Sequence, residues 1–358
     1  MSNSKEVRLI LENGDEFKGF SFGAEHSTSG EVVFSTGMVG YPESLTDPSY
    51  KGQILVLTYP LIGNYGVPGR EKESGLLKNF ESDKIQVQAL VISDYSFEYS
   101  HWNAKKSLSD WLKEENIPAI YGVDTRKLTK TIREKGAMLG KIIIDNDDVP
   151  LYDPNTIDVV KEVTIKEPIT YNDNKKNKKI VVIDCGIKNN IIRNLIRRDL
   201  TVIRVPYDYD FLTQFFDGLV ISNGPGDPKM CTKTIYNIGR ALKHEIPTFG
   251  ICLGNQLMAL AAGGNTYKMK YGHRSQNQPC TLVNTKRCYI TTQNHGFAVD
   301  VKSLGDEWQE YFVNANDGTN EGLRHRTKPF MSCQFHPEGH SGPEDTNFLF
   351  DEFVKMVK

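Results

Sequence analysis

The chain has 358 residues, more than one domain usually contains, so we expect two domains with separate hydrophobic cores. Charged residues make up 25% of the chain and hydrophobic residues 39%, and 43 Lys and Arg stand against 45 Asp and Glu. This balance leaves no excess of positive charge to attract nucleic acid or an anionic membrane, so a small-molecule substrate or a protein partner is favoured.

The N-terminal sequence Met1-Ser-Asn-Ser-Lys-Glu has neither an apolar signal core nor an Arg-rich presequence. No apolar run approaches the roughly 18 residues needed to cross a bilayer, so we expect a cytoplasmic protein and no membrane partner. Six cysteines are scattered without a Cys-x-x-Cys pair, which predicts neither a zinc site nor a disulfide framework. We expect no metal site, and any functional cysteine should act as a reduced thiol.

Residues 1–150 are expected to form a β-rich α+β domain. Short β-prone runs such as Val7–Leu11 and Glu31–Ser35 alternate with turns rich in Gly, Pro and Asp. Two stretches, 104–115 and 125–135, have the periodicity of amphipathic helices, and Asp124 is a capping signal for the second. Residues 151–178 are polar and irregular, which is typical of a linker.

From residue 179 to 358 the pattern changes to alternating strands and helices. Strands are expected at Ile180–Ile183, Thr201–Val205 and Gly218–Ser222, with a helix over 187–198. This alternation predicts an α/β domain with a parallel sheet flanked by helices. Because such sheets bind ligands at the carboxyl ends of their strands, the residues that follow the strands are the candidates for a functional site.

Cys252 lies in the sequence Phe249-Gly-Ile-Cys-Leu-Gly, which predicts a strand, a tight turn and a helix that begins near Leu253. This is the layout of a nucleophile elbow with Cys in place of Ser, and its glycines, Gly250 and Gly254, allow close approach of the backbone. The helix N-terminus would stabilise a thiolate. The alternative is a buried structural cysteine in a Gly-bounded turn.

His336 and Glu338 supply what the cysteine needs. An apolar strand is expected to end near His336, and Glu338 follows two residues later. A thiol requires a base, and the base requires an anion that fixes its orientation, so the three residues can form a triad. Taken alone, the sequence His-Pro-Glu could be a surface turn.

Two further loops could complete the site. The loop Gly224-Pro225-Gly226 follows a predicted strand and could help to stabilise an oxyanion, although it could also be an ordinary turn. The segment 293–298 offers amide and backbone groups for an amino-acid substrate. His295 is an alternative base, but His336 is preferred because of its glutamate. Cys185, Cys280, Cys288 and Cys333 are interpreted as small core residues, and Cys231 is left open.

These residues resemble a known family. Gly-Ile-Cys-Leu-Gly-Asn-Gln with a distant His-Pro-Glu resembles the class I glutamine amidotransferases, in which a cysteine attacks the side-chain amide of glutamine. The N-terminal half, through residues 30–50 and 57–66, closely resembles the small subunit of carbamoyl phosphate synthetase, as do 121–129 and 277–279. The resemblance covers nearly the whole chain.

The resemblance implies a site residue by residue. The catalytic triad falls on Cys252, His336 and Glu338, and the contacts to glutamine fall on Ser49, Gly224, Gly226, Leu253, Gln256, Asn294, Gly296 and Phe297. Asn255 departs from the histidine of many relatives, and we expect a tolerant surface position there.

The resemblance also implies the reaction and the partner. A Cys252 glutamyl thioester would release ammonia from L-glutamine, and a large subunit or fused synthetase domain would use that ammonia. No cofactor is expected in this chain, because ATP, Mg and bicarbonate would be used by the synthetase. Two alternatives stay open: a non-catalytic docking module, and a glutaminase for another amidotransferase. Pyrimidine and arginine biosynthesis are both possible destinations of the product, and the N-terminal motifs look more like the pyrimidine-pathway fusions.

Overall fold

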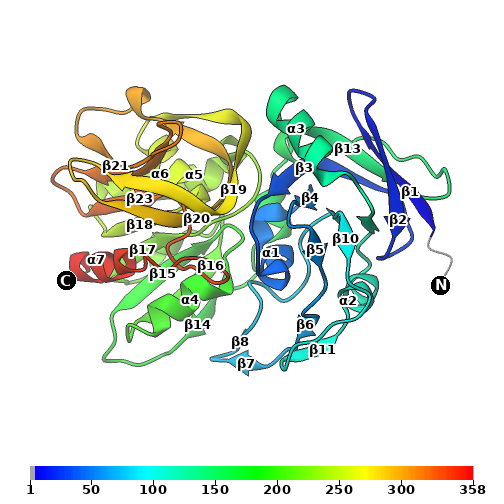
Figure 1. Cartoon of the computed structure of the whole chain (residues 1–358). Helices are drawn as coiled ribbons and strands as arrows, with labels where there is room; N and C mark the ends of the chain where they lie inside the picture. The colour runs from blue at the N-terminus through cyan, green and yellow to red at the C-terminus, as the bar shows by residue number, and fades with distance from the viewer. Residues whose placement is uncertain (1–4, 358) are drawn as a thin grey trace. The chain divides into compact units, whose positions relative to one another are not determined.

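The computed structural model describes residues 5–357, which form two compact units. The first contains the chain up to Glu73 together with Leu77–Asn155, and the second contains Ser74–Leu76 and the chain from Thr156 onward. Figure 1 shows the first unit in blue to cyan-green and the second in green to red.

Much of the segment predicted to be a linker, 151–178, is folded into the second unit. Val159 and Val160, in the 3-10 turn η3 (Val159–Glu162), are buried. The strand β14 (Ile169–Tyr171) pairs antiparallel with β16 (Thr201–Pro206) at the edge of the sheet. The polar sequence concealed this because a short edge strand needs only one paired side and few apolar residues.

The first unit is built on a closed seven-stranded barrel. Going round it, the strands are β1 (Glu6–Leu11), β13 (Met138–Ile143), β3 (Thr28–Ser35), β4 (Gln53–Leu57), β9 (Ala89–Val91), β12 (Ala119–Tyr121) and β2 (Glu16–Ser21). β1 alternates buried and more exposed side chains, as a strand with one face on the core should. The predicted β-rich α+β fold of this region is confirmed.

Shorter elements complete the first unit. Its short strands are β5 (Leu61–Ile62), β6 (Val67–Pro68), β7 (Lys72–Glu73), β10 (Asp94–Tyr95) and β11 (Ala104–Lys106). Strand β8 (Leu76–Leu77) pairs with β7 and has one residue in each unit. The helices are α1 (Tyr41–Thr46), α2 (Leu108–Glu114) and α3 (Thr125–Lys135).

The two helix predictions had different outcomes. The helix over 125–135 is confirmed, and the Asp124 carboxylate accepts a hydrogen bond from the Lys127 N–H at 2.8 Å, as a helix cap does. The helix over 104–115 is shorter than predicted, because Ser107 caps it and residues 104–106 form β11 instead. The Ser107 cap sets this boundary and outweighs the apparent periodicity of the preceding residues.

The second unit contains a ten-stranded sheet with the order β14-β16-β15-β17-β18-β23-β22-β21-β19-β20. The five strands from β16 to β23 run parallel, as predicted; they are β16, β15 (Lys179–Asp184), β17 (Gly218–Ile221), β18 (Thr248–Ile251) and β23 (Phe330–Cys333). Beyond β23 the strands are antiparallel: β22 (Asn320–His325), β21 (Trp308–Asn314), β19 (Asn265–Leu282) and β20 (Cys288–Asp300). This antiparallel extension was not predicted from the sequence.

Helices cover both faces of the parallel strands (Figure 1). Ile180 and Val182 of β15 pack in one core with α4 (Asn189–Ile196) and α7 (Phe348–Met356). Val181 and Ile183 pack in a second core with α5 (Thr232–Lys243) and α6 (Leu253–Ala261). Because successive side chains of a strand point to opposite faces, the apolar run of β15 serves both cores.

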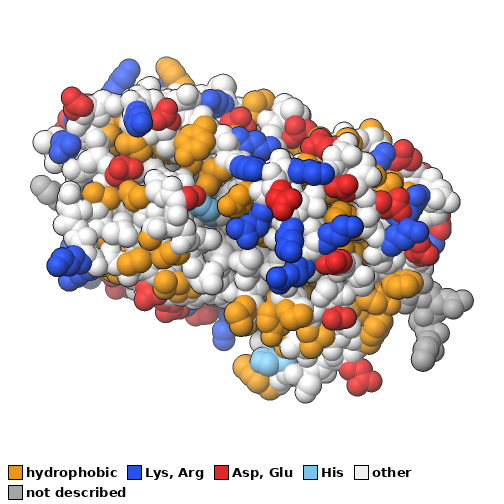
Figure 2. Space-filling view, turned by 45° about the horizontal axis from the view of Figure 1, so that its top comes forward, with side chains coloured by type: hydrophobic (Ala, Val, Ile, Leu, Met, Phe, Trp, Pro, Cys, Tyr) orange, Lys and Arg blue, Asp and Glu red, His pale blue; other side chains and the backbone are white. Residues whose placement is uncertain are grey.

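None of the helices among residues 5–357 is long and apolar enough to span a bilayer. Positive and negative side chains are both spread over the face shown in Figure 2, which agrees with a formal net charge of −2.

Candidate active site

Cys252 occupies the turn between β18 and α6. Its backbone has φ 54° and ψ −104°, a conformation that non-glycine residues rarely adopt. The turn is fixed because the Cys252 N–H donates to the Cys333 carbonyl at 2.8 Å, which links the ends of β18 and β23. Such local strain at a reactive side chain is typical of a functional turn. The predicted elbow is therefore present, and it places Cys252 at the N-terminus of α6.

The two glycines of the elbow have no room for a side chain. A Cβ atom on Gly250 would lie 2.5 Å from the Gly254 carbonyl oxygen, and one on Gly254 would lie 2.1 Å from the Ile221 carbonyl oxygen. Both distances are far below van der Waals contact, and the neighbouring atoms belong to the backbone, which cannot rotate away as a side chain can. The close packing of α6 against β17 and β18 therefore requires glycine at both positions.

His336 and Glu338 form a buried ion pair. His336 Nδ1 donates to Glu338 Oε1 at 2.7 Å, and the side chains are 1% and 0% exposed. His336 Nε2 is buried and has no hydrogen-bond partner among the described residues. The carboxylate thus fixes the ring through one nitrogen and leaves the other available for a proton.

The charges around this pair shift both pKa values. Burial alone would lower the pKa of His336, but the negative charge of Glu338 outweighs it, and Cys252 also contributes, so the pKa is raised. Burial alone would raise the pKa of Glu338, but Lys188 and His336 lower it. Both shifts favour an imidazolium beside a carboxylate.

Sequence reasoning missed Lys188, which donates from Nζ to Glu338 Oε1 at 2.9 Å. The Lys188 side chain is only 6% exposed, so water cannot solvate its charge well. The Glu338 carboxylate compensates that charge instead. Asn190, two residues further, donates from its side chain to the Glu338 backbone carbonyl at 2.5 Å. Both lie around the start of α4, far from the His-Pro-Glu sequence, and no local motif could have connected them to it.

Gln334 is a second residue that sequence reasoning missed. Its Nε2 lies 3.7 Å from Cys252 Sγ, and its Oε1 accepts from Asn255 at 3.0 Å and from Gln256 at 3.1 Å. The prediction of a tolerant surface position at Asn255 is wrong, because the residue is 0% exposed and its Oδ1 also accepts from Ser332 Oγ at 2.7 Å. The amphipathic pattern of α6 could not reveal this, since the helix is buried along most of its length.

Several of the predicted glutamine contacts in the second unit lie next to Cys252 or to one another. The Cys252 thiol donates to the Asn294 carbonyl at 3.6 Å, and Gln256 Nε2 donates to the Phe297 carbonyl at 2.8 Å. Leu253 is the first residue of α6, so its N–H lies outside the hydrogen-bond ladder of the helix.

The loop of Gly224 and Gly226 also reaches Leu253. A Cβ on Gly224 would lie 2.0 Å from the Cys185 carbonyl oxygen and 2.8 Å from Leu253 Cδ2, and Gly226 has φ +81°. Gly296 lies on β20 between His295 and Phe297. Ser49, the remaining predicted contact, is a buried residue of the first unit, and its role in binding glutamine stays a prediction.

The other five cysteines differ in burial: four are buried and one is exposed. Cys185, Cys280 and Cys333 are buried, as predicted, and Cys231 is buried too. The prediction of a core position for Cys288 is wrong, because this residue starts β20 with its side chain exposed.

Comparison with known proteins identifies the class first. Residues 181–356 match the family model of the class-I glutamine amidotransferases, and residues 9–142 match the CPSase domain of the carbamoyl-phosphate synthase small chain. The second unit is therefore a class I glutamine amidotransferase domain with its cysteine in the elbow.

The full-length relatives give the family. The chain is 48% identical to the carbamoyl phosphate synthase arginine-specific small chain of Chaetomium globosum, with 99% of this chain and 78% of the relative covered. It is 56% identical to the multifunctional protein CAD of Squalus acanthias and 53% identical to the multifunctional protein pyr1-3 of Dictyostelium discoideum, over 98% and 99% of this chain. The chain spans only 16% and 17% of the length of these two multifunctional proteins. It belongs to the carbamoyl phosphate synthase small-chain family.

Proposed function

We propose that this chain hydrolyses L-glutamine to glutamate and ammonia and delivers the ammonia to a carbamoyl phosphate synthetase subunit or domain. The observation that carries the proposal is the combination of a strained Cys252 elbow with the buried His336–Glu338 pair, whose Nε2 is free of hydrogen bonds among residues 5–357. A structural cysteine would need neither the strained turn nor the ion pair.

The first step forms a covalent bond. The Cys252 thiolate attacks the side-chain amide carbon of glutamine, and the amide oxygen becomes an oxyanion. The Leu253 N–H and the loop of Gly224 and Gly226 stabilise that oxyanion. Collapse of the tetrahedral intermediate breaks the C–N bond, and His336 protonates the departing ammonia. A glutamyl thioester on Cys252 remains.

The second step regenerates the enzyme. Neutral His336 takes a proton from water, and the oxygen attacks the thioester carbon. The C–S bond then breaks to give glutamate and the thiolate. Glu338 keeps the imidazole in the orientation that both steps require, because it holds Nδ1 at 2.7 Å. Gln256, Asn294, Gly296 and Phe297 bind the amino-acid part of the substrate in this proposal.

A synthetase is the proposed partner, acting in the cytoplasm on ATP, Mg, bicarbonate and the released ammonia. The names of relatives support this, since they include small chains of carbamoyl phosphate synthase. The first unit also exposes large apolar side chains that would suit a protein interface; they include Met38, Val39, Phe97 and Trp102, which is 87% exposed. No cofactor is proposed for this chain, which contains no Gly-x-x-x-x-Gly-Lys-Ser/Thr phosphate loop.

The proposal is tested by measuring glutamate release from glutamine with and without a carbamoyl phosphate synthetase large subunit. We expect the wild-type rate to rise with the partner and to vanish in Cys252→Ala, with circular dichroism as the check that the variant is folded. If the wild type with its partner released glutamate no faster than Cys252→Ala, the proposed glutaminase function would be wrong. The alternative of a non-catalytic docking module would then replace it. Stimulation by the synthetase of a different glutamine-dependent pathway, and not by this one, would reassign the partner.

A further inference from the structure

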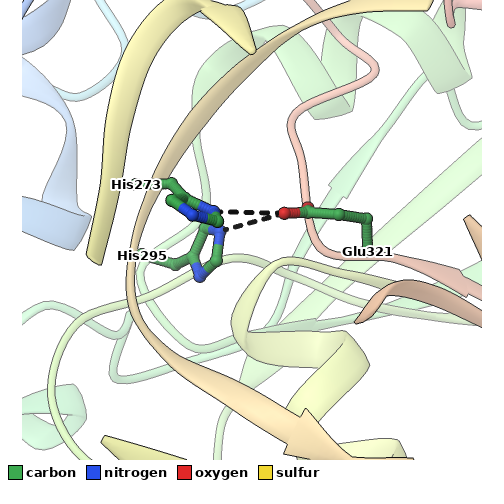
Figure 3. A group of neighbouring side chains, drawn as sticks. All are labelled: His273, His295 and Glu321. Atoms are coloured by element: carbon green, nitrogen blue, oxygen red, sulfur yellow. Dashed lines mark hydrogen bonds and ion pairs between the residues drawn. The ribbon is translucent and has the colours of Figure 1, made fainter. Parts of the chain in front are cut away.

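Three buried titratable side chains of the second unit have no part in the reaction above. They are His273 on β19, His295 on β20 and Glu321 on β22, and Figure 3 shows them converging from three strands. Their potential ligand atoms all lie within 4.8 Å of one another. Because two histidines and a carboxylate are also a common donor set for transition metals, the hydrogen bonds must decide what the group does.

The hydrogen bonds of His273 form a network with two carboxylates. Its Nε2 lies 2.9 Å from Asp317 Oδ2 and its Nδ1 lies 3.2 Å from Glu321 Oε1, so an imidazolium can donate to a carboxylate at each end. Asn314 Nδ2 also donates to Glu321 Oε1, at 3.2 Å. Protein groups thus engage both nitrogens of His273 and Glu321 Oε1, whereas Glu321 Oε2 is buried without a hydrogen-bond partner among the described residues. Because both His273 nitrogens already face carboxylates, we interpret the group as a charged network between strands.

His295 connects this network to the substrate segment. It lies directly opposite His273 in the β19–β20 ladder, and the two rings are perpendicular with centroids 5.0 Å apart. Its Nε2 is 3.8 Å from Glu321 Oε1 and 3.2 Å from Gln293 Oε1, while its Nδ1 donates to the Phe297 carbonyl at 2.9 Å.

The carbonyl that His295 holds is shared with the active site. The Phe297 carbonyl also accepts from Gln256 Nε2 at 2.8 Å, and Gln256 in turn donates to Gln334, whose amide lies next to Cys252 Sγ. The orientation of the His295 ring therefore sets the backbone at Phe297, which directly follows Gly296 and lies three residues after Asn294. Both of these residues are proposed to contact glutamine. A continuous set of contacts runs from the network to the nucleophile.

We propose that His273 and Glu321 are positioning residues for glutamine, which act through His295 to hold segment 294–297 in its binding conformation. Neither residue touches the substrate in this scheme. The proposal rests on the proposed glutaminase function and specifies how that site recognises the amino-acid part of its substrate. Since these contacts exist before and during the chemical step, their loss weakens binding uniformly and raises KM more than it lowers kcat.

The test uses Glu321→Gln and His273→Asn in the full chain with its synthetase partner. Each variant should raise the KM for glutamine by about tenfold, the effect of losing one charge-assisted hydrogen bond, while kcat changes by less than about threefold. The double variant should be no worse than the poorer single variant, because both act through the same contact. The same two changes made in Cys252→Ala should raise the calorimetric Kd for glutamine by a similar factor.

His325→Asn is the matched control for general damage. His325 lies on β22 with Glu321, is 8% exposed, and accepts hydrogen bonds from the Thr327 and Lys328 N–H groups without contacting the network. We expect it to lower the melting temperature as much as His273→Asn and to leave KM unchanged.

The outcomes separate the proposals. An unchanged KM and Kd in folded Glu321→Gln would overturn the positioning role, and so would an equal rise of KM in His325→Asn. One equivalent of tightly bound metal in the purified protein, lost in His273→Asn, would also overturn it in favour of a metal centre. If the wild type released no glutamate with its partner, the proposed glutaminase function would be wrong. The positioning role would still stand if the Kd for glutamine depended on Glu321.

Discussion

Two buried histidine–carboxylate pairs in the second unit differ in what the second ring nitrogen does. In the pair of His336 and Glu338, one nitrogen meets the carboxylate at 2.7 Å and the other has no hydrogen-bond partner among the described residues. In the pair of His273 and Glu321, joined at 3.2 Å, the second nitrogen meets Asp317. A half-satisfied histidine beside a thiol can move a proton, whereas a fully satisfied one can only hold structure.

The sharpest test of this comparison replaces each histidine by asparagine. His336→Asn should lower kcat for glutamine hydrolysis by about 10³-fold or more, because His336 is the proposed proton donor to the leaving ammonia and asparagine does not titrate. His273→Asn should leave kcat within about threefold. Steady-state kinetics with the synthetase partner measures both. A kcat loss of similar size in the two variants would remove the distinction.

Glu338→Gln should have the next largest effect, on activity and on stability. We expect kcat to fall by about 10²-fold to 10⁴-fold, because an amide does not stabilise the imidazolium. The variant also leaves Lys188 buried without its carboxylate, which costs about 3–5 kcal/mol of unfolding free energy at neutral pH.

The difference in unfolding free energy between wild type and Glu338→Gln should depend on pH, because the pKa values of Glu338 and His336 are shifted in the folded protein. The lowered pKa of Glu338 gives stability that is complete above the ordinary value of 4.5 and is lost as the pH falls through the folded value. The raised pKa of His336 gives stability that is complete below 6.5 and is lost as the pH rises through its folded value. Urea unfolding of wild type and Glu338→Gln across the pH range should show the largest gap between pH 4.5 and 6.5, where both contributions are complete. A constant gap would contradict the buried ion pair.

Lys188→Met tests whether a cation supports the catalytic pair from outside the motif. We expect a 10-fold to 100-fold lower kcat, about the value of one hydrogen bond to a charged group, and a higher pKa for Glu338. The acid limb of the pH–rate profile should therefore move to higher pH. Lys188→Arg is the matched variant, since it keeps the charge, and it should retain more activity than Lys188→Met.

Asn255→Ala should act mainly on stability. It removes the acceptor for Ser332 and the donor to Gln334, both buried, and should cost about 1–3 kcal/mol of unfolding free energy. Activity should fall by less than about tenfold, because the Asn255 side chain is linked to Cys252 only through Gln334, and the backbone hydrogen bond between the two residues is kept. Chemical denaturation and kinetics of the same preparation measure both; full stability in the variant would contradict the buried network.

Cys288→Ser should have the smallest effect. The side chain is exposed, so activity should be unchanged and stability should stay within about 0.5 kcal/mol. Burial raises the pKa of the Cys185, Cys231, Cys280 and Cys333 thiols, so these should resist a thiol reagent in the native protein. Labelling should therefore lose its fast phase in Cys288→Ser, apart from any reaction of Cys252.

The sequence alone determined the parts of this protein that depend on neighbouring residues. The glycines around Cys252 predicted the elbow because a tight turn excludes side chains, and the alternation of apolar runs predicted the parallel strands β15 to β18. Asp124 marks the start of α3 because its carboxylate accepts a hydrogen bond from the N–H of Lys127, which is only three residues away in the sequence. The resemblance of long motifs then gave the family.

Only the tertiary structure decided which residues distant in the sequence form ion pairs or hydrogen bonds with one another. Lys188 meets Glu338 across 150 residues, and Gln334 reaches both Cys252 and Asn255 across about 80. Asn255 was expected at the surface, and the residues of the His273 network come from three separate strands. Burial and pairing depend on how the sheet brings strands together, and no periodicity within one segment contains that information.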